Sequence, residues 1–591
     1  MSWKPVPGNI MTRWAKGVTP DNAWKEYPRP QMVRSKWVNL NGLWKYGICS
    51  RDEEYSEVVE GEILIPFPIE SALSGVKRAL EPGEKLFYRR DFSIPKEWIG
   101  KRILLHFGAV DWEATVWING QKLGTHQGGY IPFQFDITDL ITRKQNELVV
   151  AAWDPTDKHW QQRGKQVRKP KTIWYTAVSG IWQTVWLEPV PQTYIVNLKI
   201  EPDVDNGTVS INVNMAGVQT KMESVCIQVL DEGALVAFTE TKKGEMEAKV
   251  SIPDPKLWSP ESPYLYDLEV IAGEDKVSSY FGMRKFSIEN GRLSLNNRPY
   301  FIFGPLDQGY WPDGLYTAPS DEAMQYDIKL VKELGFNMLR KHVKVEPARY
   351  YYYCDKMGLI VWQDMVSGGR VQSEREAIWA LVFNPKRRND RAYQRFGREA
   401  AESRDNFRQE LGEMVESLFN FPSIGVWVPF NEGWGQFDAK TVGEWVRTID
   451  PTRPVDHASG WFDQGGGDFT SRHIYNLKLK PIPPVGDRAM ALTEFGGYSM
   501  KVDGHLWNPS AEFGYQKFSN PESLTKAYIS LIDNQLMPWI NAGLSAAIYT
   551  QTTDVEIEVN GFMTYDREIE KMDFRKLREL HYGIQKRCNN L

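Results

Sequence analysis

The chain has 591 residues, too many for one hydrophobic core, so its length predicts roughly three to five domains. Its 42% hydrophobic residues exclude intrinsic disorder, and its net charge of −5 gives no basic face for a nucleic acid. No apolar run approaches the roughly 18 residues of a membrane helix, and residues 1–10 contain no signal peptide. We therefore expect a soluble protein without nucleic-acid or membrane partners. It is cytoplasmic if the chain is complete, and periplasmic or secreted if a leader was trimmed.

The cysteines and histidines indicate neither a disulfide framework nor a metal site. The four cysteines lie far apart, and none of the eight histidines forms an H-E-x-x-H pattern. We expect no cofactor and no essential metal. Tryptophan is abundant, with 23 copies against 26 tyrosines and 26 phenylalanines. Such rings either fill β-sandwich cores or stack on flat apolar surfaces such as sugar rings.

The N-terminal third has the sequence pattern of a β-domain. Short alternating runs occur at 103–106, 115–118 and 148–153, and turn signals such as Asn119-Gly120 separate them. Few stretches keep a helical period. This pattern predicts a jelly roll or sandwich over residues 1–192.

A second β-domain follows a proline-spaced linker that contains Pro189 and Pro191. Alternating runs recur at 209–213, 225–230 and 265–271, within about the length of a single sandwich. We expect an immunoglobulin-like β-sandwich over residues 193–285, although the Cys…Trp…Cys core of true immunoglobulin domains is missing.

From residue 286 onwards, short apolar runs alternate with helical stretches. Helices are predicted at 321–334, 347–357 and 399–419, and strands at 299–303, 337–340, 359–362, 424–429, 455–458, 473–475, 489–493 and 546–549. Eight strands with intervening helices in about 300 residues are typical of a (β/α)8 TIM barrel, here 286–591. An open doubly wound sheet is the alternative layout, but no G-x-G-x-x-G or P-loop follows any strand.

Polar and aromatic residues follow almost every predicted barrel strand, where the active sites of such barrels lie. In chain order from the second strand they are Arg340, Lys341 and His342; Asp364; Asn431 and Glu432; Trp461 and Asp463; His473 and Tyr475; Glu494; and Gln551 and Asp554.

Glu432 and Glu494 are the strongest candidates for catalysis. Each follows a buried apolar run, where a carboxylate is costly unless it is paired or functional. The fourth and seventh strands lie on opposite sides of the ring, so both side chains can face the same mouth. Two carboxyls about 5–5.5 Å apart perform retaining glycoside hydrolysis. The alternative interpretation is that each is a solvated loop glutamate.

Motifs along the whole chain resemble glycoside hydrolase family 2, the family of β-galactosidases, β-glucuronidases and β-mannosidases. Residues 39–44, 88–92, 116–120 and 180–183 resemble its jelly-roll sugar-binding domain. Residues 430–434 (Phe-Asn-Glu-Gly-Trp) and 493–497 (Thr-Glu-Phe-Gly-Gly) resemble its acid/base and nucleophile motifs.

The resemblance implies a role for individual residues. Glu432 would be the acid/base, Glu494 the nucleophile, and Asn431 a partner of the sugar 2-hydroxyl. Tyr475 and Arg340 would hold the nucleophile in place and ionised. The remaining candidate sugar contacts are His342, Asp364, Trp461, Asp463, His473 and Gln551, with Asp554 and Asn560 weaker still. We expect the pKa of Glu432 to be raised by the nearby charge of Glu494, together with burial.

The sequence departs from the family pattern in two places. Relatives commonly have Arg-x-Ser-His after the second strand, whereas this chain has Arg340-Lys341-His342-Val343, so the histidine is shifted by one position. Glucuronidases use an Asn-x-Lys motif late in the barrel to meet the sugar carboxylate. Here Asn560-Gly561-Phe562 has no lysine, and Asn476-Leu477-Lys478 follows the sixth strand instead. These departures favour a neutral sugar.

The sequence therefore predicts a retaining exo-β-glycosidase, most like a β-galactosidase, that binds a carbohydrate substrate. A β-glucuronidase or another β-glycoside specificity is the alternative within the family. A non-catalytic carbohydrate-binding protein is the alternative from another class, and retention of both Glu432 and Glu494 argues against it. Whether the protein forms a homo-oligomer stays open.

Overall fold

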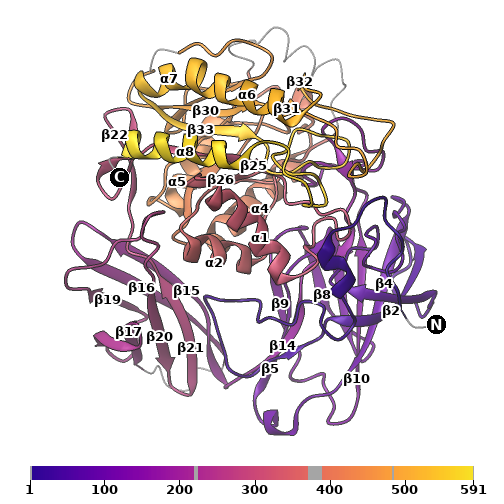
Figure 1. The fold of residues 1–591 in the computed structure, drawn as a ribbon. Coiled ribbons are helices and arrows are strands. Elements are labelled where there is room, and N and C mark those ends of the chain that lie inside the picture. The colour runs from indigo at the N-terminus through magenta and orange to yellow at the C-terminus, as the bar shows by residue number, and fades with distance from the viewer. Residues whose placement is uncertain (1–2, 218–223, 371–388, 482–484, 590–591) are drawn as a thin grey trace.

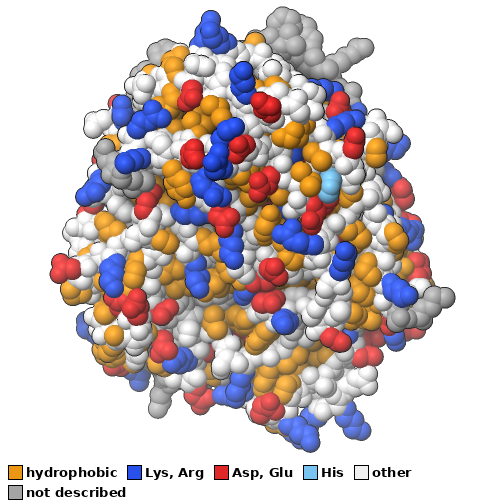
Figure 2. Space-filling model, in the orientation of Figure 1, with side chains coloured by type: hydrophobic (Ala, Val, Ile, Leu, Met, Phe, Trp, Pro, Cys, Tyr) orange, Lys and Arg blue, Asp and Glu red, His pale blue; other side chains and the backbone are white. Residues whose placement is uncertain are grey.

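The computed structural model describes residues 3–217, 224–370, 389–481 and 485–589. Figure 1 shows a jelly roll, an immunoglobulin-like sandwich and a TIM barrel, with the barrel above the other two. Figure 2 shows acidic and basic side chains interspersed over the same face. Among the described residues, no helix is both long and apolar enough to span a membrane.

The jelly roll packs two antiparallel sheets against each other. One sheet has the order β1 (Val38–Asn39), β14 (Val185–Val190), β5 (Arg102–Phe107) and β9 (Phe133–Asp136). The other has β3 (Gly61–Ile65), β2 (Gly42–Ser50), β4 (Glu84–Phe92), β10 (Asn146–Trp153), β7 (Glu113–Ile118) and β8 (Gln121–Gln127). The β7 residues Ala114 and Val116 enter the core, whereas Thr115 between them bonds Thr125 on the outer face.

Short elements complete this domain. They are the helical turns η1 (Arg13–Gly17) and η2 (Lys96–Trp98), and the pairs β6 (Val110–Asp111) with β13 (Gly180–Ile181) and β11 (Gln166–Val167) with β12 (Tyr175–Thr176). The loop of residues 161–176 around β11 and β12 reaches the barrel. The backbone N–H groups of Arg163 and Gly164 both donate to the Ser367 carbonyl at 2.9 Å. The jelly roll is therefore anchored at the mouth of the barrel.

The second domain is a sandwich of a three-stranded and a four-stranded antiparallel sheet. The first has the order β15 (Thr193–Asp203), β16 (Thr208–Gly217) and β19 (Glu247–Ser251). The second has β18 (Ala234–Glu240), β17 (Val225–Asp231), β20 (Tyr266–Ala272) and β21 (Asp275–Phe281). Alternate residues such as Ile211, Val213, Ile227 and Val229 fill the core between the sheets.

The barrel sheet is parallel and curled. Its strands run in the order β28 (Ile424–Val428), β27 (Ile360–Asp364), β26 (Met338–Lys341), β25 (Ile302–Asp307), β33 (Leu544–Thr550), β30 (Ala489–Gly496) and β29 (Phe469–Ile474). The predicted fifth strand lies next to β28 as an irregular segment, with parallel bridges from Trp427 to Val455 and from Asn431 to Ser459. The first strand begins later than expected, because Pro299 belongs to a preceding hairpin.

That hairpin is a small sheet of β22 (Phe286–Glu289), β23 (Arg292–Leu295) and β24 (Arg298–Pro299). It packs against the amino-terminal end of the barrel, where the Leu293 N–H donates to Ser545 Oγ at 3.1 Å. Phe286 and Leu293 share an apolar cluster with Ile302 and Ala546. The hairpin therefore closes the bottom of the barrel and leaves the opposite end open for the site.

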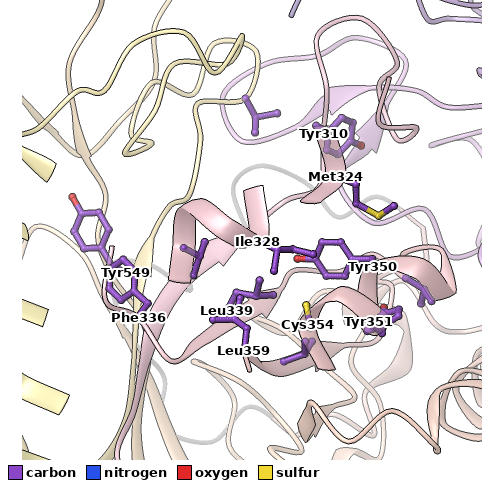
Figure 3. Close-up of a cluster of buried hydrophobic side chains, with 14 of the residues drawn as sticks. Tyr310, Met324, Ile328, Phe336, Leu339, Tyr350, Tyr351, Cys354, Leu359 and Tyr549 are labelled. Carbon is purple, nitrogen blue, oxygen red and sulfur yellow. The ribbon is translucent and has the colours of Figure 1, made fainter. Parts of the chain in front are cut away.

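Helices surround the sheet. They are α1 (Asp321–Glu333), α2 (Ala348–Met357), α4 (Ala401–Leu418), α5 (Ala439–Ile449), α6 (Pro521–Leu531), α7 (Met537–Asn541) and α8 (Phe574–Asn589), with the turns η3 (Tyr393–Phe396) and η4 (Ile532–Leu536) and the pair β31 (Tyr498–Ser499) with β32 (Gln516–Lys517). The Ser320 side chain caps α1 by accepting from the Ala323 N–H. Figure 3 shows Ile328 of α1 and Cys354 of α2 packed beside Leu339 of β26.

Candidate active site

Two carboxylates, carried by strands that lie across the ring from each other, meet at the carboxyl-terminal mouth of the barrel. Glu494 lies within β30, and Glu432 lies four residues after β28. Glu432 has the left-handed backbone φ of +51°, and Gly433 follows at +76°. A Cβ on Gly433 would lie 2.4 Å from the Phe462 ring, so only glycine fits there. This turn directs the Glu432 side chain back over the mouth.

The Glu494 carboxylate is held by three neighbours. Arg340 Nη1 donates to Oε1 at 3.2 Å, and the Tyr475 hydroxyl donates to Oε2 at 2.6 Å. His473 Nδ1 lies 3.4 Å from Oε2. Burial raises the pKa of Glu494, and the Glu432 carboxyl raises it further, whereas His473, Arg340 and Tyr475 lower it.

Glu432 has a different environment, with a hydrogen bond of 2.8 Å between its Oε1 and Nδ1 of His473. Burial raises the pKa of Glu432 to about 7, which Lys165 and Arg340 partly oppose. Burial is thus the largest cause, rather than the charge of Glu494 that the sequence led us to expect first. Arg340 and Tyr475 contact Glu494 directly, and these contacts favour its ionised form, whereas burial favours the protonated form of Glu432.

The two carboxylates lie close to each other and to one histidine. One side-chain oxygen of Glu432, one of Glu494 and one ring nitrogen of His473 all lie within 4.8 Å of one another. Retaining glycosidases have their two carboxyls about 5–5.5 Å apart, and inverting ones about 6.5–9.5 Å. Burial lowers the pKa of His473 to about 4, so its ring is neutral between the two carboxyls.

The same three side chains are of the types that bind a divalent cation. The Arg340 guanidinium, however, already neutralises Glu494 at 3.2 Å, and a second cation beside it would be repelled. The donor set therefore fits a proton-transfer site better than a metal centre.

Arg340 connects the parts of the site. Its Nε donates to Asp364 Oδ1 at 2.9 Å, its Nη2 to Asn431 Oδ1 at 2.7 Å, and its Nη1 to the Thr493 carbonyl at 3.0 Å. The oxygen of the Asn431 amide is thereby fixed, and its buried Nδ2 has no hydrogen-bond partner among the described residues. That nitrogen is a donor available to a bound molecule beside Glu432.

Asp364 and His342 form a fully buried pair behind Arg340. His342 Nδ1 lies 2.9 Å from Asp364 Oδ2, and Arg340 takes the other Asp364 oxygen. Burial lowers the pKa of His342 well below its usual range. The role of Asp364 and His342 as sugar contacts stays a prediction. Their hydrogen bonds hold the Arg340 guanidinium in position.

Trp461 and Asp463, predicted on the fifth strand, differ in placement. The Trp461 ring lies beside His473, with 6.3 Å between ring centroids. Both oxygens of Asp463 are engaged by Arg488, at 3.0 and 3.1 Å, directly before β30. Arg488 and His457 lower the pKa of Asp463 strongly. Among the described residues, no hydrogen bond or ion pair joins Asp463 to Glu432 or Glu494, and its role as a sugar contact stays a prediction.

The residues after β33 form a buried hydrogen-bonded chain. Gln551 accepts from Gln308 and donates to Asn560, both at 2.8 Å, and Asn560 donates to Glu558 at 2.9 Å. Asp554 pairs separately with Lys571 at 2.6 Å. Gln551 and Asn560 thus support Glu558, a residue that the sequence did not single out.

The jelly roll supplies further residues to the mouth that were not expected from the sequence. Its Tyr175 hydroxyl donates to Glu558, and its Trp174 ring lies 5.0 Å from the ring of Trp434 in the acid/base motif. Its Lys165 acts on the pKa of Glu432. Within the barrel, Tyr515 stacks on Tyr475 at 3.8 Å between centroids. No spacing in the sequence connects these residues to the barrel motifs.

Comparisons with known proteins agree on the class of the chain. Family models described as "Glycosyl hydrolases family 2, sugar binding domain", "Glycosyl hydrolases family 2" and "Glycosyl hydrolases family 2, TIM barrel domain" match residues 21–191, 193–284 and 286–479. A β-galactosidase of Lactococcus lactis is 26% identical over 93% of this chain and 55% of its own length. A putative β-glucuronidase of Formosa agariphila is 27% identical over 60% of this chain and 41% of its own. The chain spans about half the length of such curated relatives.

Solved structures show the same fold. A β-glucuronidase of Ruminococcus gnavus aligns with a TM-score of 0.74 at 17% identity, over 95% of this chain and 99% of that chain. A β-galacturonidase of Eisenbergiella tayi aligns with a TM-score of 0.69 at 19% identity, over 94% and 99%.

Proposed function

The chain belongs to glycosyl hydrolases family 2, and from this we propose that it is a retaining exo-β-glycosidase that hydrolyses terminal β-linked sugars. The observation that carries the proposal is the placement of Glu432 and Glu494 at the mouth of the barrel, with side-chain oxygens within 4.8 Å. The different environments of the two carboxyls support different roles for them.

In the first step Glu494 is the nucleophile. Its carboxylate attacks the anomeric carbon while the bond to the glycosidic oxygen breaks, and Glu432 gives its proton to that oxygen. The products are a glycosyl ester of Glu494, a free alcohol and an ionised Glu432. Arg340 and Tyr475 support this role because they stabilise the Glu494 carboxylate before attack.

In the second step Glu432 is the base. It takes a proton from a water molecule, whose oxygen attacks the anomeric carbon and releases Glu494 as a carboxylate. Two inversions leave the β configuration unchanged. The free Nδ2 of Asn431 is suited to donate to the sugar 2-hydroxyl, a contact that strengthens in the transition state.

We propose β-galactosides as the preferred substrates, because Asn560-Gly561-Phe562 lacks the lysine that meets a uronate in glucuronidases. The second candidate is a β-uronide specificity, favoured by a pocket of about 390 Å³ beside the site. It is lined by Asn476 and Lys478 together with Tyr515, whose ring stacks on Tyr475. Lys341, which follows the second barrel strand, is not available for this role, because it pairs with Asp307 and Glu346 at 2.7 and 2.8 Å.

The test is the Glu494→Ala variant on nitrophenyl β-glycosides, with the exposed Glu522→Ala as the matched control. We expect turnover to fall by several orders of magnitude in Glu494→Ala alone. Azide should then enter the vacated face and give an α-glycosyl azide, whereas the wild type should release the β-anomer first in proton NMR. Near-normal turnover in Glu494→Ala, or an α-anomer from the wild type, would refute the proposal.

A further inference from the structure

Lys165, which the jelly roll supplies to the barrel mouth, lies beside two tryptophan rings. Its Nζ is 4.9 Å from the centre of the Trp434 ring and 6.0 Å from that of Trp174. Trp434 is tied to the acid/base turn, because its N–H donates to the Asn431 carbonyl at 2.9 Å. The ammonium group therefore lies near the turn that carries Glu432, although the two positions are 267 apart in the sequence.

This lysine differs from the other buried lysines. In the described part of the chain four lysines are buried, namely Lys165, Lys341, Lys344 and Lys571. The last three each have a carboxylate oxygen within 2.8 Å. The Lys165 ammonium forms no hydrogen bond or ion pair with any described residue, and the tryptophan rings only partly compensate its charge. A buried ammonium without a carboxylate partner is suited to pair with an anion that enters the mouth.

The backbone around Lys165 is held firmly. Gly164 has a φ of +59°, and a Cβ there would lie 2.6 Å from the Val343 carbonyl. The Gly164 N–H donates to Ser367, and the Lys165 carbonyl accepts from the Tyr175 N–H at 3.0 Å. Lys165 is thus presented to the mouth on a rigid support, as precise recognition requires.

We propose that Lys165, flanked by Trp174 and Trp434, is a specificity-determining residue that binds a negatively charged group, a carboxylate or a sulfate, on the carbohydrate substrate. This inference rests on the proposed glycosidase function and adds a substrate class to it. The tryptophan faces would pack against the sugar ring, and the ammonium would pair with its anionic oxygens. The charge sits either on the glycone or on the leaving group.

Lys165 also has an effect that every substrate shares, because its charge lowers the pKa of Glu432. A loss of activity alone would therefore not identify an anion site. The ratio of kcat/KM between anionic and neutral substrates removes this common effect.

The experiment uses the full chain and three nitrophenyl substrates: a neutral β-galactoside, a β-uronide, and a β-galactoside whose nitrophenyl ring carries a carboxylate. The variants are Lys165→Met, Lys165→Arg and, as the matched control, Lys169→Met, an exposed lysine of the same loop. In Lys165→Met we expect the ratio for one anionic substrate to fall about 10- to 100-fold, mainly through KM. Lys165→Arg should retain most of the preference for the anionic substrate, and Lys169→Met should leave the ratio of kcat/KM unchanged. The substrate that responds tells whether the charge is on the glycone or the leaving group.

Equal loss on all three substrates would overturn the inference and leave the glycosidase proposal intact. If the wild type cleaves none of them, both fail. Calorimetric titration of the Glu494→Gln variant with the uronic acid and with the carboxylated phenol gives a readout independent of turnover. Unchanged binding of both after Lys165→Met would also overturn the inference.

Discussion

Glu432 can be tested by removing its proton, either through pH or through the Glu432→Ala substitution. Burial holds its pKa at about 7, and it acts as an acid in its protonated form. Activity that needs the acid is therefore complete well below pH 7 and is lost as pH rises through that value. At pH 9 about one molecule in 100 keeps the proton, so kcat/KM for alkyl glycosides should fall about tenfold per pH unit above 7.

The Glu432→Ala variant should separate the two steps of the reaction. General acid catalysis contributes about 10²–10⁴-fold, so alkyl glycosides and disaccharides should lose a factor of this size. Dinitrophenyl glycosides need little acid help and should still esterify Glu494. The ester should then accumulate, because no base activates water.

The assay is stopped-flow detection of dinitrophenol, together with pH profiles for both substrate classes. We expect the Glu432→Ala variant to release a burst of dinitrophenol and then to reach a slow steady state. Azide should accelerate this steady state and give a β-glycosyl azide. The pH profile of the variant should have no alkaline limb near pH 7. Equal slowing of both substrate classes, with no burst and no azide effect, would show that Glu432 is not the acid/base.

Three further predictions follow from the same contacts. β-Galactosides should have a higher kcat/KM than the matching glucuronides in nitrophenol release; the opposite order would favour the uronide specificity and Lys478 as the carboxylate partner. Glu432→Gln should stabilise the fold at pH 8 by up to about 3 kcal/mol in urea denaturation and by little at pH 4. The pKa of Glu432 is higher in the folded than in the unfolded protein, so ionisation of this carboxyl lowers the free energy of unfolding as the pH rises from about 4.5 to 7. An equal effect of Glu432→Gln at pH 4 and pH 8 would contradict this. Tyr475→Phe removes a 2.6 Å hydrogen bond to Glu494, so the acid limb of kcat/KM should move to higher pH; an unmoved limb would rule out that role of Tyr475.

The strands of the barrel could be predicted because their signals are local. Ile424–Val428 and Ala489–Gly496 are apolar runs, each closely followed by glycine turns, and both catalytic candidates could be found from that pattern. The fifth strand was harder to place exactly, since Asp456 and His457 are buried polar residues within an irregular segment. Local periodicity cannot indicate where such a segment pairs.

Contacts between distant segments could not be predicted. Asp463 follows a strand, as we expect of a sugar contact, and its ion pair with Arg488 could not be predicted because only the folded chain brings the two together. The source of the Glu432 pKa shift also depends on packing around the carboxyl rather than on any neighbour in the sequence. Lys165 and Trp174 lie in a loop whose sequence contains no pattern that predicts its contact with the barrel.

The anchoring of residues 161–176 on the barrel has a consequence for how this architecture can evolve. Arg163 and Gly164 both bond to Ser367, and Tyr175 bonds to Glu558, so two domains of one chain contribute to the mouth. A chimaera that exchanged the jelly roll for that of a relative would also exchange part of the active site. Under the proposed function, substrate preference would depend on the contact between the two domains, and an exchange of either domain would change it.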